Sequence, residues 1–174
     1  MSSYIMDLRQ LVGHRPLMQV GASVLIVDAE RGLLLQKRKD NACWGYHGGA
    51  VELDESVEAA AARELEEETG LIPQKLELLG VFSGPALHYQ YPNGDEVSNV
   101  EIFFVCRQWS GTLKPQKEEV LELKFFQPSE IPVELNPPNR PSLAAWLKSE
   151  GLTLPAHLAE FEESHSYTFS RTSK

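Results

Sequence analysis

The sequence predicts an α/β fold in which helices cover a mixed β-sheet. Apolar segments of strand length open the chain, a strongly helical segment follows them, and further apolar segments come after the helix. Strands on both sides of a central helix bury their apolar faces best in a layered α/β structure. A chain of 174 residues, 42% of them hydrophobic, has the size of one domain, which we place at residues 1–150 with a tail at 151–174.

The first predicted elements are two strands and a helix. Residues 18–28 are largely β-branched and apolar, and residues 33–38, which open with three leucines, follow a turn signal, so both segments predict strands. Residues 56–69 are rich in Ala and Glu and predict a helix. Ser56 is the expected N-cap of this helix, and Gly70 is its expected end.

The later segments predict three more strands and a short helix. The strands are expected at residues 76–82, 100–106 and 121–126. Asn93-Gly94, the dipeptide that most favours a tight hairpin turn, lies between the first two. Residues 142–148 predict the helix after a proline-rich stretch. The tail from Gly151 onward is rich in Glu, Ser, His and Thr, and we expect it to be partly disordered or to form a short helix.

Composition and charge exclude several classes of function. A formal net charge of −9 argues against binding of a nucleic-acid polymer, because such proteins carry excess Lys and Arg. No uncharged apolar run approaches the ~20 residues that span a bilayer, and no signal peptide is evident, so we expect a cytoplasmic protein without membrane contact. Cys43 and Cys106 are too few for a disulfide scaffold, and we expect reduced packing thiols.

The predicted helix carries an acidic cluster on an unusual face. At ~100° per residue, Glu64, Glu67 and Glu68 share one face, and Glu66 points the other way. The apolar stripe of the first helical turns continues into this acidic face, so the three carboxylates should turn toward the protein body. Such a cluster needs a cation, and an all-oxygen ligand set favours Mg²⁺ or Mn²⁺. A merely solvated acidic helix end is the alternative.

The residues around this helix resemble the Nudix hydrolase family. The segment from Gly49 to Leu71 reads G-x5-E-x7-R-E-U-x-E-E-x-G-U with U aliphatic, which is the complete Nudix box. The resemblance extends over residues 18–132. It implies a Nudix-type α/β/α sandwich with a mixed β-sheet. It also implies a Mg²⁺-dependent (or Mn²⁺-dependent) hydrolase that cleaves a diphosphate linkage in a nucleoside diphosphate derivative.

The resemblance also implies roles for individual residues. The expected metal ligands are Glu64, Glu67, Glu68, Glu55 and a carbonyl of the glycine loop at Gly49. We expect the first three carboxylates to converge beside the loop backbone at residues 48–50. The expected catalytic residues are Glu67, Glu68, Arg63 and Glu119. Arg63 would orient the glutamates. Glu119 is a candidate general base, and the box glutamates and Glu122 are the alternatives. The expected substrate-binding residues are Gly48, Tyr89, His47 and Arg38.

Two positions depart from the family's common pattern. His47 stands where Pro usually precedes the glycine pair, and Asp54 stands where Gly usually precedes the first box Glu. Neither position binds metal in the family. His47 either reaches a substrate phosphate or simply replaces a rigid loop residue.

The substrate stays open between ADP-ribose, a dinucleoside polyphosphate and a nucleoside triphosphate. Pro85 lies 14 places after the box, near the marker of ADP-ribose hydrolases, and Tyr89 lies 18 places after it, as in dinucleoside polyphosphate hydrolases. Tyr89 and Tyr91 either stack on a base or pack on one face of a strand.

Alternatives also remain for the function and for the oligomeric state. A catalytically silent Nudix-fold regulator that binds a nucleotide is the main alternative, and the intact box glutamates argue against it. An isomerase of the same fold would need Cys43 or Cys106 as an acid-base thiol. The expected partner is a small nucleotide-type molecule, and a homodimer is one option for the oligomeric state.

Overall fold

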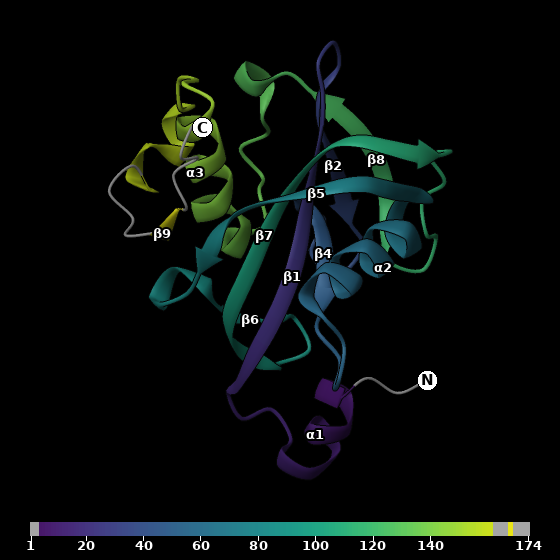
Figure 1. Ribbon diagram of the computed structural model, residues 1–174. Coiled ribbons are helices and arrows are strands. Elements are labelled where there is room, and N and C mark those ends of the chain that lie inside the picture. The colour runs from purple at the N-terminus through teal and green to yellow at the C-terminus, as the bar shows by residue number, and fades with distance from the viewer. Residues whose placement is uncertain (1–3, 162–166, 169–174) are drawn as a thin grey trace.

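The computed structural model describes residues 4–161 and 167–168. Three α-helices are present in this part of the chain (Figure 1): α1 (Tyr4–Val12), α2 (Val57–Thr69) and α3 (Arg140–Ser149). The strands are β1 (Leu17–Asp28), β2 (Gly32–Arg38), β3 (Trp44–Gly45), β4 (His47–Ala50), β5 (Leu71–Phe82), β6 (His88–Gln90), β7 (Glu96–Gly111), β8 (Val120–Phe126) and β9 (Tyr167–Thr168). Short 3₁₀ turns lie at η1 (Pro85–Leu87), η2 (Pro128–Glu130), η3 (Pro137–Asn139) and η4 (Ala156–Phe161).

The strands form one mixed sheet around β1 and β7. These two strands run parallel in register from Leu17↔Val97 to Ile26↔Cys106. The pairings of β5 and β6 with β7, and of β2 and β4 with β1, are antiparallel. β8 and β3 continue the sheet from β2. The mixed β-sheet expected from the sequence is therefore confirmed.

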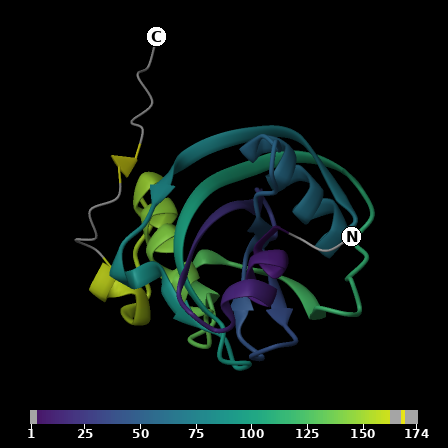
Figure 2. The same ribbon diagram turned by 90° about the horizontal axis from the view of Figure 1, so that it is seen from below.

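Both faces of this sheet are covered, as expected for an α/β/α sandwich. Successive residues of a strand point to opposite faces. On β1, Val24 and Ile26 pack in the cluster under α2, whereas Leu25 packs in the cluster under α3. Figures 1 and 2 show α2 and α3 on opposite sides of the curved sheet. The central strands are apolar throughout because they are buried from two sides.

Helix α2 begins and ends as predicted. The Ser56 hydroxyl accepts a hydrogen bond from the Ala59 N–H at 3.2 Å. Gly70 ends the helix with a φ of 72°, and its N–H donates to the Glu66 carbonyl. A Cβ at Gly70 would lie 2.7 Å from the Thr112 carbonyl oxygen, so both the backbone angle and the space favour glycine.

Several boundaries differ from the sequence predictions. β5 starts at Leu71 and β7 spans residues 96–111, because the two strands pair over almost their whole length, with register shifts between them. The short strands β3 and β4 and the helix α1 were not predicted. The hairpin at Asn93-Gly94 is confirmed, since the Tyr91 N–H donates to the Asp95 carbonyl across it.

The tail is partly ordered against the body. Leu158 of η4 is fully buried in the cluster under α3, and β9 pairs with β5. Residues 162–166 and 169–174 lie outside the described residues, so disorder there stays a prediction. Among the helices of residues 4–161, none has the length and apolar content needed to cross a bilayer.

Candidate functional site

The site forms where the sheet forks beside α2. Residues 21–24 of β1 pair with β4, and residues 26–28 of the same strand pair with β2. β4 and β2 therefore pair with successive parts of β1 and diverge from each other. The Gln36 side-chain amide of β2 donates to the Tyr46 carbonyl at 3.3 Å and links the two branches. This fork carries the glycine loop under the C-terminal half of α2.

The glycine loop lies directly against two of the predicted glutamates. Side chains alternate along β4, so positions 47 and 49 face α2. A Cβ at Gly49 would lie 2.5 Å from Oε1 of Glu64, which means that the Glu64 carboxylate occupies the space that a side chain would fill. The Gly48 N–H donates to Oε2 of Glu68 at 3.1 Å. The expectation that carboxylates meet the loop backbone is confirmed for these two residues.

Arg63 ties the glutamates together. Its guanidinium donates to both carboxylate oxygens of Glu55, at 2.8 and 2.9 Å, and to Oε1 of Glu64 at 2.7 Å. It also donates to the Ala50 carbonyl at 3.2 Å and lies 3.7 Å from a carboxylate oxygen of Glu67. The fork of a guanidinium suits such multiple contacts, so Arg63 fixes the direction of Glu64.

The charges in this cluster change the acidity of Glu64. Burial raises the pKa of Glu64 to about 7, and the charges of Glu68 and Glu67 add to this, whereas the Arg63 hydrogen bond opposes it. The pKa of Glu55 lies below its ordinary value because Arg63 donates to it. Arg63 therefore neutralises Glu55 more fully than Glu64. A bound cation would relieve the remaining repulsion at Glu64.

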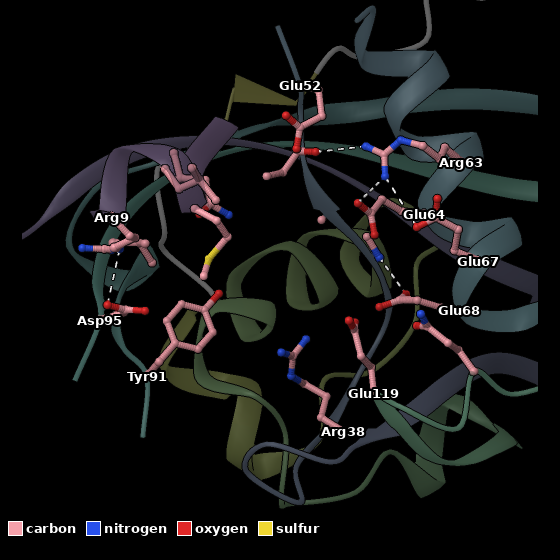
Figure 3. Close-up of a pocket in the computed structure, with 18 of the residues that line it drawn as sticks. Arg9, Arg38, Glu52, Arg63, Glu64, Glu67, Glu68, Tyr91, Asp95 and Glu119 are labelled. Carbon is pink, nitrogen blue, oxygen red and sulfur yellow. Dashed lines mark hydrogen bonds and ion pairs between the residues drawn. The ribbon is translucent and has the colours of Figure 1, made fainter. Parts of the chain in front are cut away.

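The cluster opens into a cavity of about 960 Å³. Figure 3 shows Glu64, Glu67 and Glu68 on one side of it, Tyr91 and the Arg9–Asp95 pair on the other, and Arg38 and Glu119 between them. The cavity is lined by residues of α1, β1, β2, β4, the loop after β4, α2, the β6–β7 hairpin and the loop before β8: Ile5, Met6, Arg9, Gln19, Arg38, Gly48, Gly49, Ala50, Glu52, Arg63, Glu64, Glu67, Glu68, Tyr91, Asn93, Asp95, Val97, Gln116 and Glu119.

Arg38 and Glu119 give the middle of the cavity both signs of charge. Arg38 makes a two-pronged contact with Asp40, at 3.0 and 2.9 Å, which fixes its guanidinium at the cavity wall. Burial raises the pKa of Glu119, and repulsion from Glu68 adds to the rise. A carboxylate with a raised pKa is a stronger proton acceptor than an ordinary one, which suits a general base. Glu122 does not line this cavity.

His47 lies beneath the cluster and away from the cavity. Its side chain is fully buried, its Nδ1 is 3.5 Å from Oε2 of Glu68, and neither ring nitrogen has a hydrogen-bond partner among the described residues. Because His47 does not line the cavity, its position gives no support to the predicted phosphate contact. The position instead supports the alternative that it replaces a rigid loop residue.

The two tyrosines of the predicted substrate region have different surroundings. Their rings meet edge to face with centroids 5.0 Å apart, so they pack on one face of the hairpin. The Tyr89 hydroxyl accepts a hydrogen bond from Asn41, and Tyr89 does not line the cavity. Tyr91 does line it. The substrate contact assigned to Tyr89 is thus better placed at Tyr91.

A buried polar group supports the glycine loop from its other face. The Glu101 carboxyl accepts hydrogen bonds from the Tyr46 hydroxyl, at 2.7 and 2.8 Å, and from the Ser23 hydroxyl at 3.0 Å. Burial raises the pKa of Glu101. A Cβ at Gly48 would lie 2.5 Å from the Ser23 hydroxyl oxygen, so this loop is confined on both sides.

The donor set fits Mg²⁺ or Mn²⁺. In residues 4–161 and 167–168, no three His, Cys, Asp or Glu side chains stand close enough to enclose a metal ion by themselves. Mg²⁺ does not require such a cage, because it keeps several waters and binds through one or two carboxylates together with substrate phosphates. Glu64 and Glu68 lie where they would supply those carboxylates. Glu67 also lines the cavity, but its side chain is 53% exposed and its carboxylate lies 3.7 Å from the Arg63 guanidinium, so its convergence on the loop stays a prediction.

The structure therefore brings together most, but not all, of the predicted site residues. Those lining the cavity are Arg38, Gly48, Gly49, Arg63, Glu64, Glu67, Glu68 and Glu119. Glu55 lies beside them with both oxygens held by Arg63. Glu52, Gln116 and the α1 residues Ile5, Met6 and Arg9 also line the cavity and were not predicted. Apolar residues at positions 5, 8 and 12 could have predicted the helix, but nothing in the sequence placed it at the cavity.

The cysteines are free, and neither lines the cavity. Burial raises the pKa of Cys106, so this thiol is poorly suited to acid-base work near neutral pH. The isomerase alternative receives no support from these positions.

Comparisons with known proteins agree with this geometry. A model of the NUDIX domain matches residues 17–147. An ADP-ribose pyrophosphatase of Methanocaldococcus jannaschii is 39% identical over 110 residues, which are 62% of this chain and 61% of that protein. The chain thus matches less than two thirds of that relative's length. A MutT-like protein of Streptomyces ambofaciens is 31% identical over 67% of this chain and 68% of its own.

A solved structure shares the fold. The crystal structure of a MutT NUDIX hydrolase from Burkholderia pseudomallei superposes with a TM-score of 0.62 at 30% identity, covering 73% of this chain and 96% of that one.

Proposed function

The chain belongs to the NUDIX family, and we propose that it is a divalent-cation-dependent pyrophosphohydrolase that cleaves the diphosphate linkage of a nucleoside diphosphate derivative. The observation that carries this proposal is the placement of the Glu64 and Glu68 carboxylates against the glycine loop at the wall of a large cavity. The name of the archaeal relative favours ADP-ribose as the first substrate to test. A dinucleoside polyphosphate and a nucleoside triphosphate are the other candidates.

The residues of the cavity have separate tasks in this reaction. Glu64, Glu67 and Glu68 would hold Mg²⁺ or Mn²⁺, and the ion would supply charge withdrawal from phosphate oxygens and a lowered pKa of bound water. Arg63 and the Gly48 N–H keep two of these carboxylates in place. Arg38 offers positive charge to the substrate's phosphates.

The bond changes are those of anhydride hydrolysis. The oxygen of a water molecule bonds to phosphorus, the bond from that phosphorus to the bridging oxygen breaks, and the bridging oxygen leaves on a phosphate. Glu119, at the cavity wall with a raised pKa, accepts the water proton.

A substrate panel tests the proposal. ADP-ribose, dinucleoside polyphosphates, nucleoside triphosphates and nucleotide sugars are incubated with Mg²⁺ or Mn²⁺, and with chelator, and products are separated by ion-exchange chromatography. We expect metal-dependent release of a nucleoside monophosphate from at least one of them. Binding of a nucleotide without any turnover would instead support the silent regulator.

Two single variants locate the chemistry on one face of α2. Glu67→Gln should lower kcat by ~10²-fold or more, because it removes a charge that holds the cation. Glu66→Gln is the matched control: it makes the same change one residue away, on a side chain that is exposed and does not line the cavity. Equal activities of the two variants would remove Glu67 from the mechanism.

The cytoplasmic location and the homodimer stay predictions.

A further inference from the structure

Helix α1 lies outside the part of the chain that the NUDIX domain matches, yet it forms one wall of the cavity. The match begins at residue 17, whereas α1 spans Tyr4–Val12. Ile5, Met6 and Arg9 of this helix line the same cavity as the glutamates of α2. The helix lies at one end of the sheet (Figures 1 and 2). This chain therefore closes its cavity with a segment that precedes the family domain.

The contacts of Arg9 fix α1 in this position. The side chain of Arg9 is 8% exposed, and its guanidinium donates to the carbonyl oxygens of Gly13, Arg15 and Glu96. Its Nε lies 3.5 Å from Asp95, which also accepts a contact from His14. One buried cation thus joins α1, the turn after it and the β6–β7 hairpin.

A second contact joins α1 to the loop that follows the glycines. The Tyr4 N–H donates to a carboxylate oxygen of Glu52 at 2.8 Å. Arg9 therefore holds the second half of α1 to the β6–β7 hairpin, and the Tyr4 N–H holds the start of α1 to the loop after β4. The wall is therefore built into the fold and connects directly to the site.

The wall differs in chemistry from the acidic side of the cavity. Ile5, Met6 and Val97 are apolar, and the aromatic Tyr91 stands on the same side as Arg9 in Figure 3. The two charged side chains there, Arg9 and Asp95, are paired with each other. The cavity thus has a charged half suited to phosphates and cations and a half that offers apolar and aromatic surface.

From this division we propose that α1 and Tyr91 form a specificity wall that holds the nucleoside end of the substrate while its diphosphate lies at the α2 glutamates. The proposal rests on the proposed function and names which half of the substrate meets which wall. The aromatic ring of Tyr91, the flexible thioether of Met6 and the branched aliphatic chain of Ile5 line the same cavity, and such a surface suits a flat, largely apolar base. A volume of about 960 Å³ lies at the upper end of the ~300–1,000 Å³ typical of ligand pockets, so it admits a nucleoside in addition to a diphosphate.

Paired variants on the same helix test the wall. Met6→Ser alters a side chain that lines the cavity and is 51% exposed, so the fold should tolerate it. Leu11→Ser is the matched control, since Leu11 is 83% exposed on the same helix and does not line the cavity. Tyr91→Ala and Tyr91→Phe form a second pair, of which only the first removes the ring.

Binding is measured apart from catalysis. The Kd of AMP in the presence of chelator is determined by isothermal titration calorimetry, and kcat and KM for ADP-ribose are determined with Mg²⁺. Met6→Ser and Tyr91→Ala should each raise the AMP Kd and the ADP-ribose KM about tenfold, with a smaller effect on kcat. Leu11→Ser should stay within about twofold of wild type, and Tyr91→Phe, which keeps the ring, should raise both values less than Tyr91→Ala does. Inhibition by pyrophosphate with Mg²⁺, which reports on the charged half, should be unchanged in all four variants.

The outcomes separate the wall from the proposed function. If Met6→Ser and Leu11→Ser behave alike in AMP binding, or if pyrophosphate inhibition weakens together with AMP binding, the wall does not hold the nucleoside. If the wild type fails to bind AMP, the inference is overturned even when hydrolysis is observed. If no substrate is hydrolysed but AMP binding responds as expected, the wall stands and the proposed reaction is wrong.

Discussion

Two residues without side chains determine where the carboxylates of this site lie. Gly49 leaves the space in which the Glu64 carboxylate sits, and Gly48 offers its N–H to Glu68. Arg63 then holds Glu64 from the other side. The position of each carboxylate therefore depends on backbone approach as well as on the helix that carries it.

A single methyl group at the loop should disturb the site. In Gly49→Ala the new Cβ would lie 2.5 Å from Oε1 of Glu64, so the carboxylate must move. We expect at least tenfold weaker Mg²⁺ binding, measured by calorimetry, because ligand placement sets the affinity. Gly21→Ala is the control on the paired strand, since its Cβ would meet only the Gly49 carbonyl at 3.5 Å, an ordinary contact. Equal metal affinity in both variants would show that Glu64 is not a ligand.

The acidity of Glu64 predicts a pH dependence of stability. Burial and like charges raise its pKa from 4.5 to about 7, so the folded protein binds a proton that the unfolded chain releases between these values. Stability without metal should therefore fall as pH rises through this window. We expect the Tm of the wild type in chelator to drop from about pH 5 to about pH 8 more steeply than that of Glu64→Gln, by differential scanning calorimetry. Parallel curves would mean that Glu64 ionises normally.

The direction of a single side chain could be predicted from the sequence only within regular secondary structure. The period of the helix placed Glu64 and Glu68 on the inward face and Glu66 outward, and the structure agrees for the contacts of Glu64 and Glu68 with the loop. Tyr91 was weighed together with Tyr89 because both are aromatic and two residues apart. Which of them lines the cavity depends on how the hairpin lies against α1, and local periodicity does not contain that information.

The elements around the site divide into a rigid helix and a strained loop. α2 has a side-chain N-cap and a glycine C-cap, and Ala60, Ala61 and Leu65 bury its inner face. The loop from 51 to 56 that leads into it contains Asp54 with a φ of 63°, in the left-handed region. The absence of the family's usual glycine here is thus visible as a backbone conformation that most side chains avoid.

Restoring glycine at this position should stabilise the loop. Asp54→Gly removes a strain of ~1–2 kcal/mol, which is partly offset by ~0.4–1 kcal/mol of added chain entropy in the unfolded state, for a net gain of ~0–1.6 kcal/mol. Asp54→Ala removes the same charge but keeps a Cβ, so it should be less stable than Asp54→Gly. Urea denaturation of the two variants isolates the backbone effect. A more stable Ala variant would contradict this explanation.

The longer elements followed from sequence pattern, and the shorter ones did not. β1, β2, α2, β8 and α3 have strong periodic or apolar signals and were predicted to within a few residues. β3 and β4 have two and four residues; β3 pairs with its sequence neighbour β2, and β4 depends on pairing with β1, which is more distant in sequence. A two-residue strand carries no period of its own, so only the assembled sheet defines it.

Most of the excess negative charge of the molecule lies in one segment, and the rest of the chain is nearly balanced in charge. Eight acidic residues and one basic residue lie between positions 52 and 68, and the sandwich turns Glu64 and Glu68 of this segment inward. Arg63 is the one basic residue of this segment, and the charges of Glu68 and Glu67 add to the rise in the pKa of Glu64 that burial causes. The folded state without metal therefore stores a repulsion that unfolding relieves, and a cation that binds only the folded form should couple metal binding to stability.

Millimolar Mg²⁺ should raise the Tm of the wild type. At a concentration 100 times the Kd, a ligand that binds only the folded state adds ~2.7 kcal/mol, or roughly 5–10 °C for a domain of this size. The Glu64→Gln, Glu68→Gln double variant should melt higher than the wild type in chelator and gain less from Mg²⁺, because it loses both the repulsion and the charged ligands. Each Gln keeps an oxygen that can accept the hydrogen bonds from Arg63 and the Gly48 N–H, so the change is mainly one of charge. Melting curves in chelator and then in Mg²⁺ or Mn²⁺, at constant ionic strength, make the comparison. Equal gains in the two proteins would place the metal elsewhere, whereas a smaller gain in the double variant would tie the charge, the metal and the stability of the fold to the same two side chains.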